Sequence, residues 1–296
     1  MRSGVAILHH LQGRSRDLGG GFEVRRLLPS AACRSVGPFI FFDHFGPLDV
    51  APSARHDVRP HPHIGLATVT YLFEGAILHR DSLGSVQRIE PGAINWMTAG
   101  RGIVHSERTP EDLLGHARRI HGLQLWVALP AAQEECAPDF VHVGADAMPE
   151  LDEHGVRLRV LVGELHGQRS PVETAMDTLY LDVRLADGAA WHVPGVVAER
   201  AVYCTEGAIT VDGVPLPPHT LAVLRPDASP VVATVDGARL VVIGGAPLPE
   251  PRYMWWNFVS ARRERIQQAA ADWDSGRFEP VPGDDERVPL PESRFA

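Results

Sequence analysis

Short apolar segments separated by turn residues recur along most of the chain. β-branched and aromatic residues fill segments such as 67–73, and turn-forming pairs such as Pro91-Gly92 lie between them. Short strands at this spacing are typical of a sandwich or a barrel. The pattern predicts strands at 37–42, 67–73, 77–80, 85–89, 93–97 and 121–130, and then at 156–162, 179–185, 201–205, 208–211, 221–224, 231–234 and 239–243.

One stretch near the C-terminus has the period of an amphipathic helix instead. After Phe258, apolar residues recur at helical spacing, at Ile266, Ala269, Ala270 and Trp273. Ser260 is the expected N-cap of this helix, and Gly276 is expected to end it. The tail at 277–296 is rich in Pro and Asp, so it is expected to add little to a core.

An internal repeat indicates two copies of one fold. Residues 71–77 (YLFEGAI) match residues 203–209 (YCTEGAI) at five of seven positions. Two tandem β-barrels are the simplest explanation. The segment 131–155, rich in Ala, Glu, Asp and Pro, separates them. We therefore expect an all-β chain with one barrel in 1–135 and a second in 136–296, the latter carrying the C-terminal helix and the tail.

Composition and charge narrow the class of protein. The 25 Pro and 28 Gly, with only 22% charged residues, fit a turn-rich β protein. The net charge of −9 argues against nucleic acid as a direct partner, because phosphate binding requires a basic surface. Three scattered cysteines without a CxxC motif are typical of a reducing compartment. Since neither a signal peptide nor a membrane span is evident, we expect a soluble cytoplasmic protein.

Two pairs of metal-competent residues stand out in the predicted first barrel. They are His61 and His63 in the segment PHPH, and His105 and Glu107 in HSE. Residues two apart on a strand point to the same face, so each pair can present two ligands in one direction. Pro62 favours an extended conformation for the residue before it. Facing strands would then form a site of three histidines and one carboxylate.

The ligand types restrict the metal without fixing it. Imidazole and carboxylate without thiolate suit Fe(II), Mn, Ni, Cu or Zn. Four protein ligands leave a coordination position for water, substrate or dioxygen, which favours a reactive site, although a metal that only stabilises the barrel is the alternative. In the second copy, the positions of His61 and His63 correspond to Val193 and Gly195. We therefore expect a single metal, in the first barrel.

The His-x-His motif and the later histidine between strands resemble the cupin arrangement. The usual first cupin motif has a Glu where this chain has Thr68, and Gly75 sits where its closing Gly would be. A carboxylate at Glu107 instead is the pattern of the pirin family of two-cupin proteins. The segments 36–47, 60–75, 79–85, 96–107 and 121–130 also resemble that family, and 251–273 resembles a bacterial pirin-like subgroup.

This resemblance has implications for the fold, the metal ligands and the activity. It implies two jelly-roll barrels of the cupin type, with metal ligands at His61, His63, His105 and Glu107, Fe(II) as the favoured metal, and a metal-free second barrel. Several pirins open quercetin with dioxygen, so a quercetin 2,3-dioxygenase-like oxidoreductase acting on a small aromatic substrate is the leading interpretation. Glu107 would also be its catalytic base.

Two alternatives to this activity stay open. Other pirins are described as regulators that bind protein partners, including a transcription cofactor, and such a role needs no catalysis. An enzyme with an unidentified substrate is the other alternative, because the fold does not fix the substrate. Within the barrel, His79, Trp96 and Met97 are candidates to line the site, with packing in the barrel core as the competing interpretation.

Overall fold

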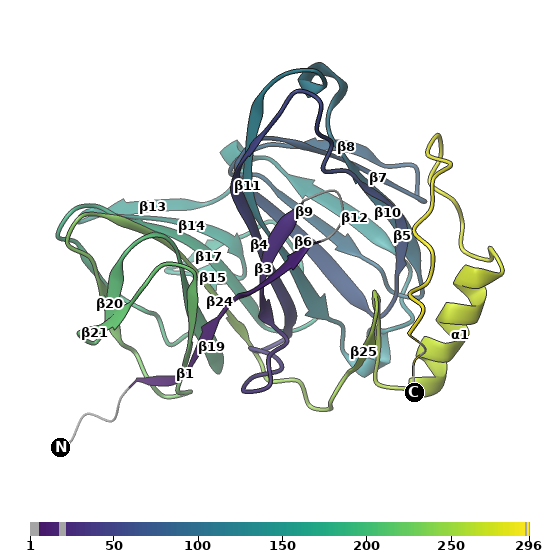
Figure 1. The fold of residues 1–296 in the computed structure, drawn as a ribbon. Helices are drawn as coiled ribbons and strands as arrows, with labels where there is room; N and C mark the ends of the chain where they lie inside the picture. Colours follow the sequence, from purple (N-terminus) through teal and green to yellow (C-terminus); the bar gives the residue numbers. More distant parts are fainter. Residues whose placement is uncertain (1–5, 18–21, 294, 296) are drawn as a thin grey trace. The chain divides into compact units, whose positions relative to one another are not determined.

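The computed structural model describes residues 6–17, 22–293 and 295 of the chain (Figure 1). Among these residues, strands dominate and the only α-helix is α1, Arg263–Asp274. Short 3-10 turns lie at Glu111–Leu113, Ala131–Gln133 and Ala145–Ala147. The all-β prediction with one C-terminal helix is confirmed. No helix in the described part of the chain is long and apolar enough to cross a membrane.

The chain forms two compact units, and each unit is built from segments that are not consecutive in the sequence. The unit called barrel N here comprises the described parts of 16–24, 43–145 and 249–296. The unit called barrel C comprises those of 1–15, 25–42 and 146–248. Each barrel therefore contains segments from both sides of the expected boundary at 135/136.

Two segments depart from that expected division. Strand β1 (Ile7–Gln12) pairs antiparallel with β22 (Thr220–Leu224) of barrel C, with Leu11 opposite Leu221. Helix α1 packs on barrel N, where its apolar face joins Ile64 and Val104 in one cluster. In both cases apolar side chains of the segment become buried against the barrel, which favours this packing.

Barrel N consists of two sheets. Its strands are β2 (Arg14–Asp17), β3 (Glu23–Leu28), β4 (Phe39–Val50), β5 (Val58–His63), β6 (Leu66–Glu74), β7 (Ile77–Asp81), β8 (Val86–Ile89), β9 (Ile94–Thr98), β10 (Ile103–Arg108), β11 (Arg118–Ala128) and β12 (Asp139–Val143). The larger sheet has the order β12-β9-β6-β11-β4-β3-β2, and the smaller has the order β5-β10-β7-β8. β2, β3 and β4 also contribute residues to barrel C. A separate hairpin joins β25 (Tyr253–Trp255) to β26 (Phe258–Ser260).

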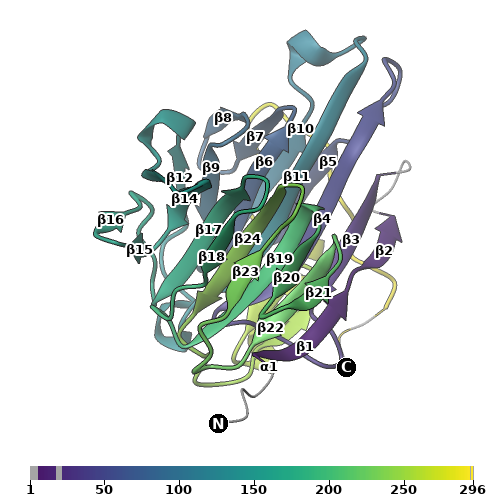
Figure 2. The ribbon, with the colours of Figure 1, turned by 90° about the vertical axis from the view of Figure 1, so that its left-hand side faces the viewer.

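Barrel C repeats this plan (Figure 2). Its further strands are β13 (Glu150–Glu153), β14 (Val156–Val162), β15 (Glu164–Leu165), β16 (Gln168–Arg169), β17 (Thr178–Leu185), β18 (Ala190–His192), β19 (Glu199–Gly207), β20 (Ile209–Val211), β21 (Val214–Leu216), β23 (Val231–Ala233) and β24 (Ala238–Gly245). A sheet β1-β22-β19-β24-β17-β14-β13 accompanies a sheet β18-β23-β20-β21. Buried aliphatic residues of both sheets, such as Val202, Val232 and Val242, form one core.

The sequence repeat has a structural counterpart. Tyr71 on β6 lies between Ile94 on β9 and Leu123 on β11. Tyr203 on β19 lies in the same way between a residue of β22 and a residue of β24. Both copies therefore occupy a central strand of the larger sheet, and the prediction of two barrels is confirmed.

The predicted helix is present, but it begins later than expected. Its N-cap is Arg262, without a side-chain cap, whereas the hydroxyl of Ser260 donates to Glu134 Oε2 at 2.8 Å. Ser260 is therefore wrong as an N-cap, because the helix begins two residues later and Ser260 Oγ accepts the backbone N–H of Arg262, at 3.0 Å, which precedes the first turn. Gly276 follows the C-cap with φ +70°, a left-handed conformation that glycine adopts without a Cβ penalty, so its predicted role is confirmed.

Candidate metal centre

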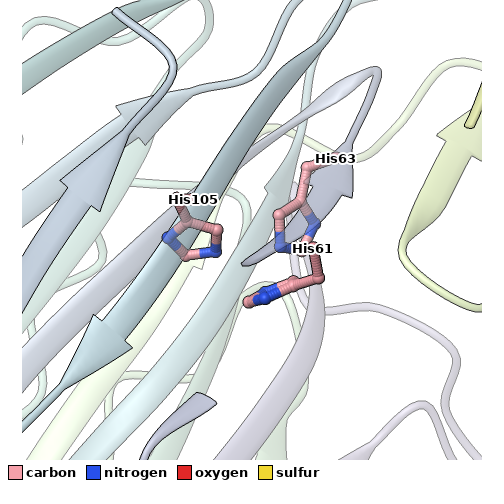
Figure 3. Close-up of side chains that lie close together, drawn as sticks. All are labelled: His61, His63 and His105. Carbon is pink, nitrogen blue, oxygen red and sulfur yellow. The ribbon is translucent and has the colours of Figure 1, made fainter. Parts of the chain in front are cut away.

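Three histidines converge from two neighbouring strands of barrel N (Figure 3). His61 and His63 lie on β5, and His105 lies on the antiparallel neighbour β10, directly opposite His61 in the register. Residues opposite each other on adjacent strands share a face, as do residues two apart on one strand. The strand periodicity therefore brings the three imidazoles to the same side of the small sheet.

The distances fit a single small cation. One ligand nitrogen from each ring can be chosen so that all three lie within 4.8 Å of one another. The ring centroids of His61 and His105 are 4.4 Å apart, and His63 lies 5.0 Å from each. All three side chains are buried. A cluster of this size could hold one metal ion.

Backbone carbonyls orient two of the rings. His61 Nδ1 lies 2.8 Å from the carbonyl oxygen of Arg59, and His63 Nδ1 lies 3.2 Å from that of Asn257. A carbonyl only accepts, so each Nδ1 carries the proton and donates it. Each Nε2 then keeps its lone pair, which is the form that binds a metal.

His105 provides an independent test of whether a metal fits. Both of its ring nitrogens are buried and have no hydrogen-bond partner among the described residues. A buried polar atom without a partner is destabilising by about 1–3 kcal/mol. A cation bound by one of these nitrogens would remove part of that cost. The residues present therefore fit a metal ion.

Burial keeps the three imidazoles neutral. It lowers the pKa of His61 to about 4, from an ordinary value of 6.5, and it lowers the pKa values of His63 and His105 well below 6.5. The neighbouring imidazoles add a smaller effect in the same direction. At pH 7 the site therefore presents lone pairs without first having to release protons.

The predicted fourth ligand, Glu107, lies beside the histidine cluster but outside it. Glu107 follows His105 on β10 at the same face, and a bulge interrupts the β10–β5 pairing between them. Its carboxylate is not part of the group whose ligand atoms lie within 4.8 Å of one another. Thr70 Oγ1 is 3.4 Å from Glu107 Oε1. Burial raises the pKa of Glu107, and its role as a ligand stays a prediction.

The larger sheet covers the site with two rows of side chains. The register aligns Gln124, Thr70, Asn95 and His142 in one row, and Trp126, Thr68, Met97 and Phe140 in the next. Thr70 Oγ1 donates to Gln124 Oε1 at 2.8 Å. The Trp126 ring lies 5.2 Å from His63, so the second row faces the metal ligands.

Of the three residues predicted to line the site, two lie on its side of their strands and one does not. His79 is buried with its ring 5.4 Å from that of His105, so it lies at the site. Met97 belongs to the row that contains Thr68. Trp96 points to the opposite face of the sheet, where its Nε1 donates to Thr98 Oγ1 at 3.2 Å. Trp96 is therefore wrong as a lining residue, because strand alternation turns it away.

Sequence reasoning missed a buried pair next to the site. His79 Nε2 lies 2.9 Å from Asp81 Oδ2, and the backbone N–H groups of Leu83 and Ser85 donate to Asp81 Oδ1. Burial raises the pKa of Asp81, but the interactions with His79 and Ser85 outweigh this effect, so the net shift of the pKa is downward. The signal available in the sequence was His-x-Asp on a predicted strand, which has the same two-residue spacing as His61 and His63.

In barrel C the corresponding positions carry other groups. Val193 is fully buried in the apolar core. A Cβ at Gly195 would lie 3.6 Å from Arg200 Nη1, and this buried guanidinium donates to the Pro194 carbonyl at 3.1 Å. A buried cation at this place disfavours a metal ion. The metal-free second barrel nevertheless stays a prediction.

Two family models match the chain. The one described as Pirin matches residues 21–127, and the one described as Pirin C-terminal cupin domain matches residues 180–279. A Pirin-like protein of Caulobacter vibrioides is 45% identical over 283 residues, which cover 94% of this chain and 97% of that protein.

Solved structures match over nearly the whole chain as well. A crystal structure of quercetin 2,3-dioxygenase from Acinetobacter baumannii is similar with a TM-score of 0.89 and 32% identity, covering 98% of this chain and 96% of that one. A second structure of quercetin 2,3-dioxygenase from the same organism has a TM-score of 0.84 at 29% identity, covering 92% of this chain and 97% of that one.

Proposed function

This chain belongs to the pirin family, and on that premise we propose that it is a metal-dependent dioxygenase that opens quercetin-type flavonols with O₂. The observation that carries the proposal is the convergence of three buried, neutral imidazoles, of which His61 and His63 keep their Nε2 lone pairs available because their Nδ1 atoms donate to backbone carbonyls. The similarity to quercetin 2,3-dioxygenase of Acinetobacter baumannii supports the choice of substrate.

His61, His63 and His105 would hold the metal, with Glu107 as the fourth ligand. Fe(II) is the proposed metal, and it would supply the electron transfer that lets triplet O₂ react with a singlet organic molecule. Histidine with a carboxylate and no thiolate is a donor set that suits iron. The stacked pair of His79 and Phe140, with ring centroids 4.2 Å apart, adds an aromatic wall beside these ligands.

Glu107 is the proposed proton acceptor. Its partly buried carboxylate has a raised pKa, which makes it a stronger base than an ordinary carboxylate. A flavonol hydroxyl placed within hydrogen-bond reach of Glu107 would transfer its proton to the carboxylate oxygen that does not hold the metal. The resulting enolate is the more electron-rich form, and oxidation is easier from it. Thr70 Oγ1 lies 3.4 Å from Oε1, so it would orient the carboxylate by turning its single hydroxyl proton from Gln124 to Glu107.

Oxygen uptake tests this function. Protein reconstituted with Fe(II) under anaerobic conditions is mixed with quercetin and O₂, and O₂ consumption is compared with the loss of flavonol absorbance. We expect equal molar loss of both in the wild type, and a rate at least about 100-fold lower in His61→Ala. The exposed His192→Ala in barrel C is the matched control and should keep the wild-type rate. Equal rates in the wild type and His61→Ala would refute the proposal.

A further inference from the structure

The strand that carries His61 and His63 lies at the edge of its sheet. The order β5-β10-β7-β8 leaves one side of β5 without a strand of that sheet. The C-terminal segment covers this side at two points (Figure 1). Val259 donates its N–H to the Ile64 carbonyl at 3.2 Å, and Val288 donates its N–H to the Pro60 carbonyl at 2.9 Å. These two hydrogen bonds bracket the His-x-His motif.

The same segment also touches a ligand directly. The carbonyl that accepts the Nδ1 proton of His63 belongs to Asn257, at the tip of the β25–β26 hairpin. Next to it, Ile64, the residue that follows β5, forms an isolated parallel bridge with Phe258 of β26. The orientation of the His63 ring therefore depends on where the C-terminal hairpin sits.

A second set of contacts holds the strand that carries His105 and Glu107. Ser106, between these two residues, donates its hydroxyl proton to Asp284 Oδ2 at 2.7 Å. Arg108 donates from Nε to the same oxygen at 2.9 Å, and from Nη2 to Glu286 at 2.6 Å. Since Ser106 and Arg108 alternate with the ligands, Asp284 binds the outer face of β10 while the ligands occupy the inner face.

The tail that carries Asp284 is itself anchored to helix α1. Trp273 Nε1 donates to the Val288 carbonyl at 3.0 Å, and the Arg287 guanidinium lies 4.0 Å from the centre of the Trp273 ring. Val281 is buried in the same cluster as Trp273. The Pro- and Asp-rich tail was expected to add little, yet it connects the helix to both ligand strands.

We propose that the C-terminal segment from Asn257 to Val288 is a positioning element of the metal centre, and that Asp284 is its principal positioning residue. This inference rests on the proposed metal site. The segment fixes β5 from its edge and β10 from its outer face, so the two ligand pairs keep the spacing that one metal ion requires. Partners that orient metal ligands typically change affinity 10- to 100-fold when they are lost.

Thermodynamic coupling requires the effect to be reciprocal. If contact of the C-terminal segment with β5 and β10 favours the convergent arrangement of the ligands, then a bound metal ion must in turn favour that contact. Metal binding should therefore protect the backbone N–H of Val288 from hydrogen exchange, because this N–H is hydrogen-bonded to the Pro60 carbonyl only while the tail lies against β5.

The test measures metal affinity in the full chain with Co(II) as the probe. Dissociation constants are determined by competition with a chromophoric chelator for the wild type, Asp284→Asn, Asp284→Glu and Asp272→Asn. Asp272 is the matched control, since it also forms an ion pair in the C-terminal segment, but its partner is Arg277, at 2.7 Å, and not a residue of a ligand strand. Circular dichroism of the metal-free proteins verifies that each variant is folded.

We expect Asp284→Asn to raise the dissociation constant at least about tenfold, Asp284→Glu to recover part of the loss, and Asp272→Asn to stay within about twofold of the wild type. The visible absorption band of bound Co(II) should change in Asp284→Asn, because the metal ligands of this variant are less well ordered. In the wild type, Co(II) should slow hydrogen exchange at the backbone N–H of Val288. Equal affinities of Asp284→Asn and Asp272→Asn would overturn the inference alone. A wild type that binds no Co(II) would overturn the metal site and this inference together.

Discussion

The lowered pKa of His61 predicts that the metal-free protein loses stability in mild acid. The pKa of this imidazole is about 4 in the folded chain, against an ordinary 6.5 in an unfolded one. Between these two values the unfolded state binds a proton that the folded state does not. The free energy of unfolding is therefore highest above pH 6.5, and falls as the pH drops toward 4.

The size of the effect follows from the two pKa values. Linkage gives a loss of about 2 kcal/mol between pH 7.5 and pH 5 for His61 alone, and about 3 kcal/mol once the pH reaches 4. His63 and His105 act in the same direction, because burial lowers their pKa values too. The decisive comparison is His61→Gln, since glutamine keeps polar atoms at this position but does not titrate.

Urea unfolding followed by tryptophan fluorescence, with a chelator present, measures this difference. The wild type should lose about 2 kcal/mol more than His61→Gln on going from pH 7.5 to pH 5. Exposed His192→Gln serves as the control and should follow the wild type. The same loss in the wild type and in His61→Gln would refute the argument that burial holds this imidazole neutral.

Three further predictions concern other parts of the molecule. Glu107→Gln should still bind metal through the histidines, but O₂ uptake with quercetin should fall at least about 100-fold, because the proposed base is lost. Asp182→Asn breaks a buried ion pair with Arg239, whose Nη2 lies 2.6 Å from Asp182 Oδ2; urea unfolding should show a loss of about 3–5 kcal/mol while metal content is unchanged. Gly65→Ala, at φ +70° with its new Cβ against the Val259 carbonyl, should push the C-terminal hairpin away, and chelator competition should show weaker metal binding.

The histidine ligands could be predicted because their geometry is local. A spacing of two residues on a strand places side chains on one face whatever the rest of the fold does, and this rule puts His61 and His63 together. The same rule predicts the side of β10 to which Glu107 belongs. It does not predict the bulge between His105 and Glu107, which depends on the pairing of two strands far apart in the sequence.

The parts that escaped prediction depend on contacts between distant segments. Asn257 reaches His63 across 194 residues, and Asp284 reaches Ser106 across 178 residues. No hydrophobic period or short motif encodes such contacts. The pairing of β1 with β22 is likewise non-local, so the division of the chain into barrels could not be drawn from chain order.

Metal content tests the central claim most directly. Wild-type protein and His105→Ala are loaded with Fe(II) without oxygen, desalted, and analysed for metal per chain by mass spectrometry. The claim that three converging histidines form one metal centre predicts about one metal ion per chain in the wild type and almost none in His105→Ala, with both proteins folded by circular dichroism. Equal metal content in the two proteins would contradict it.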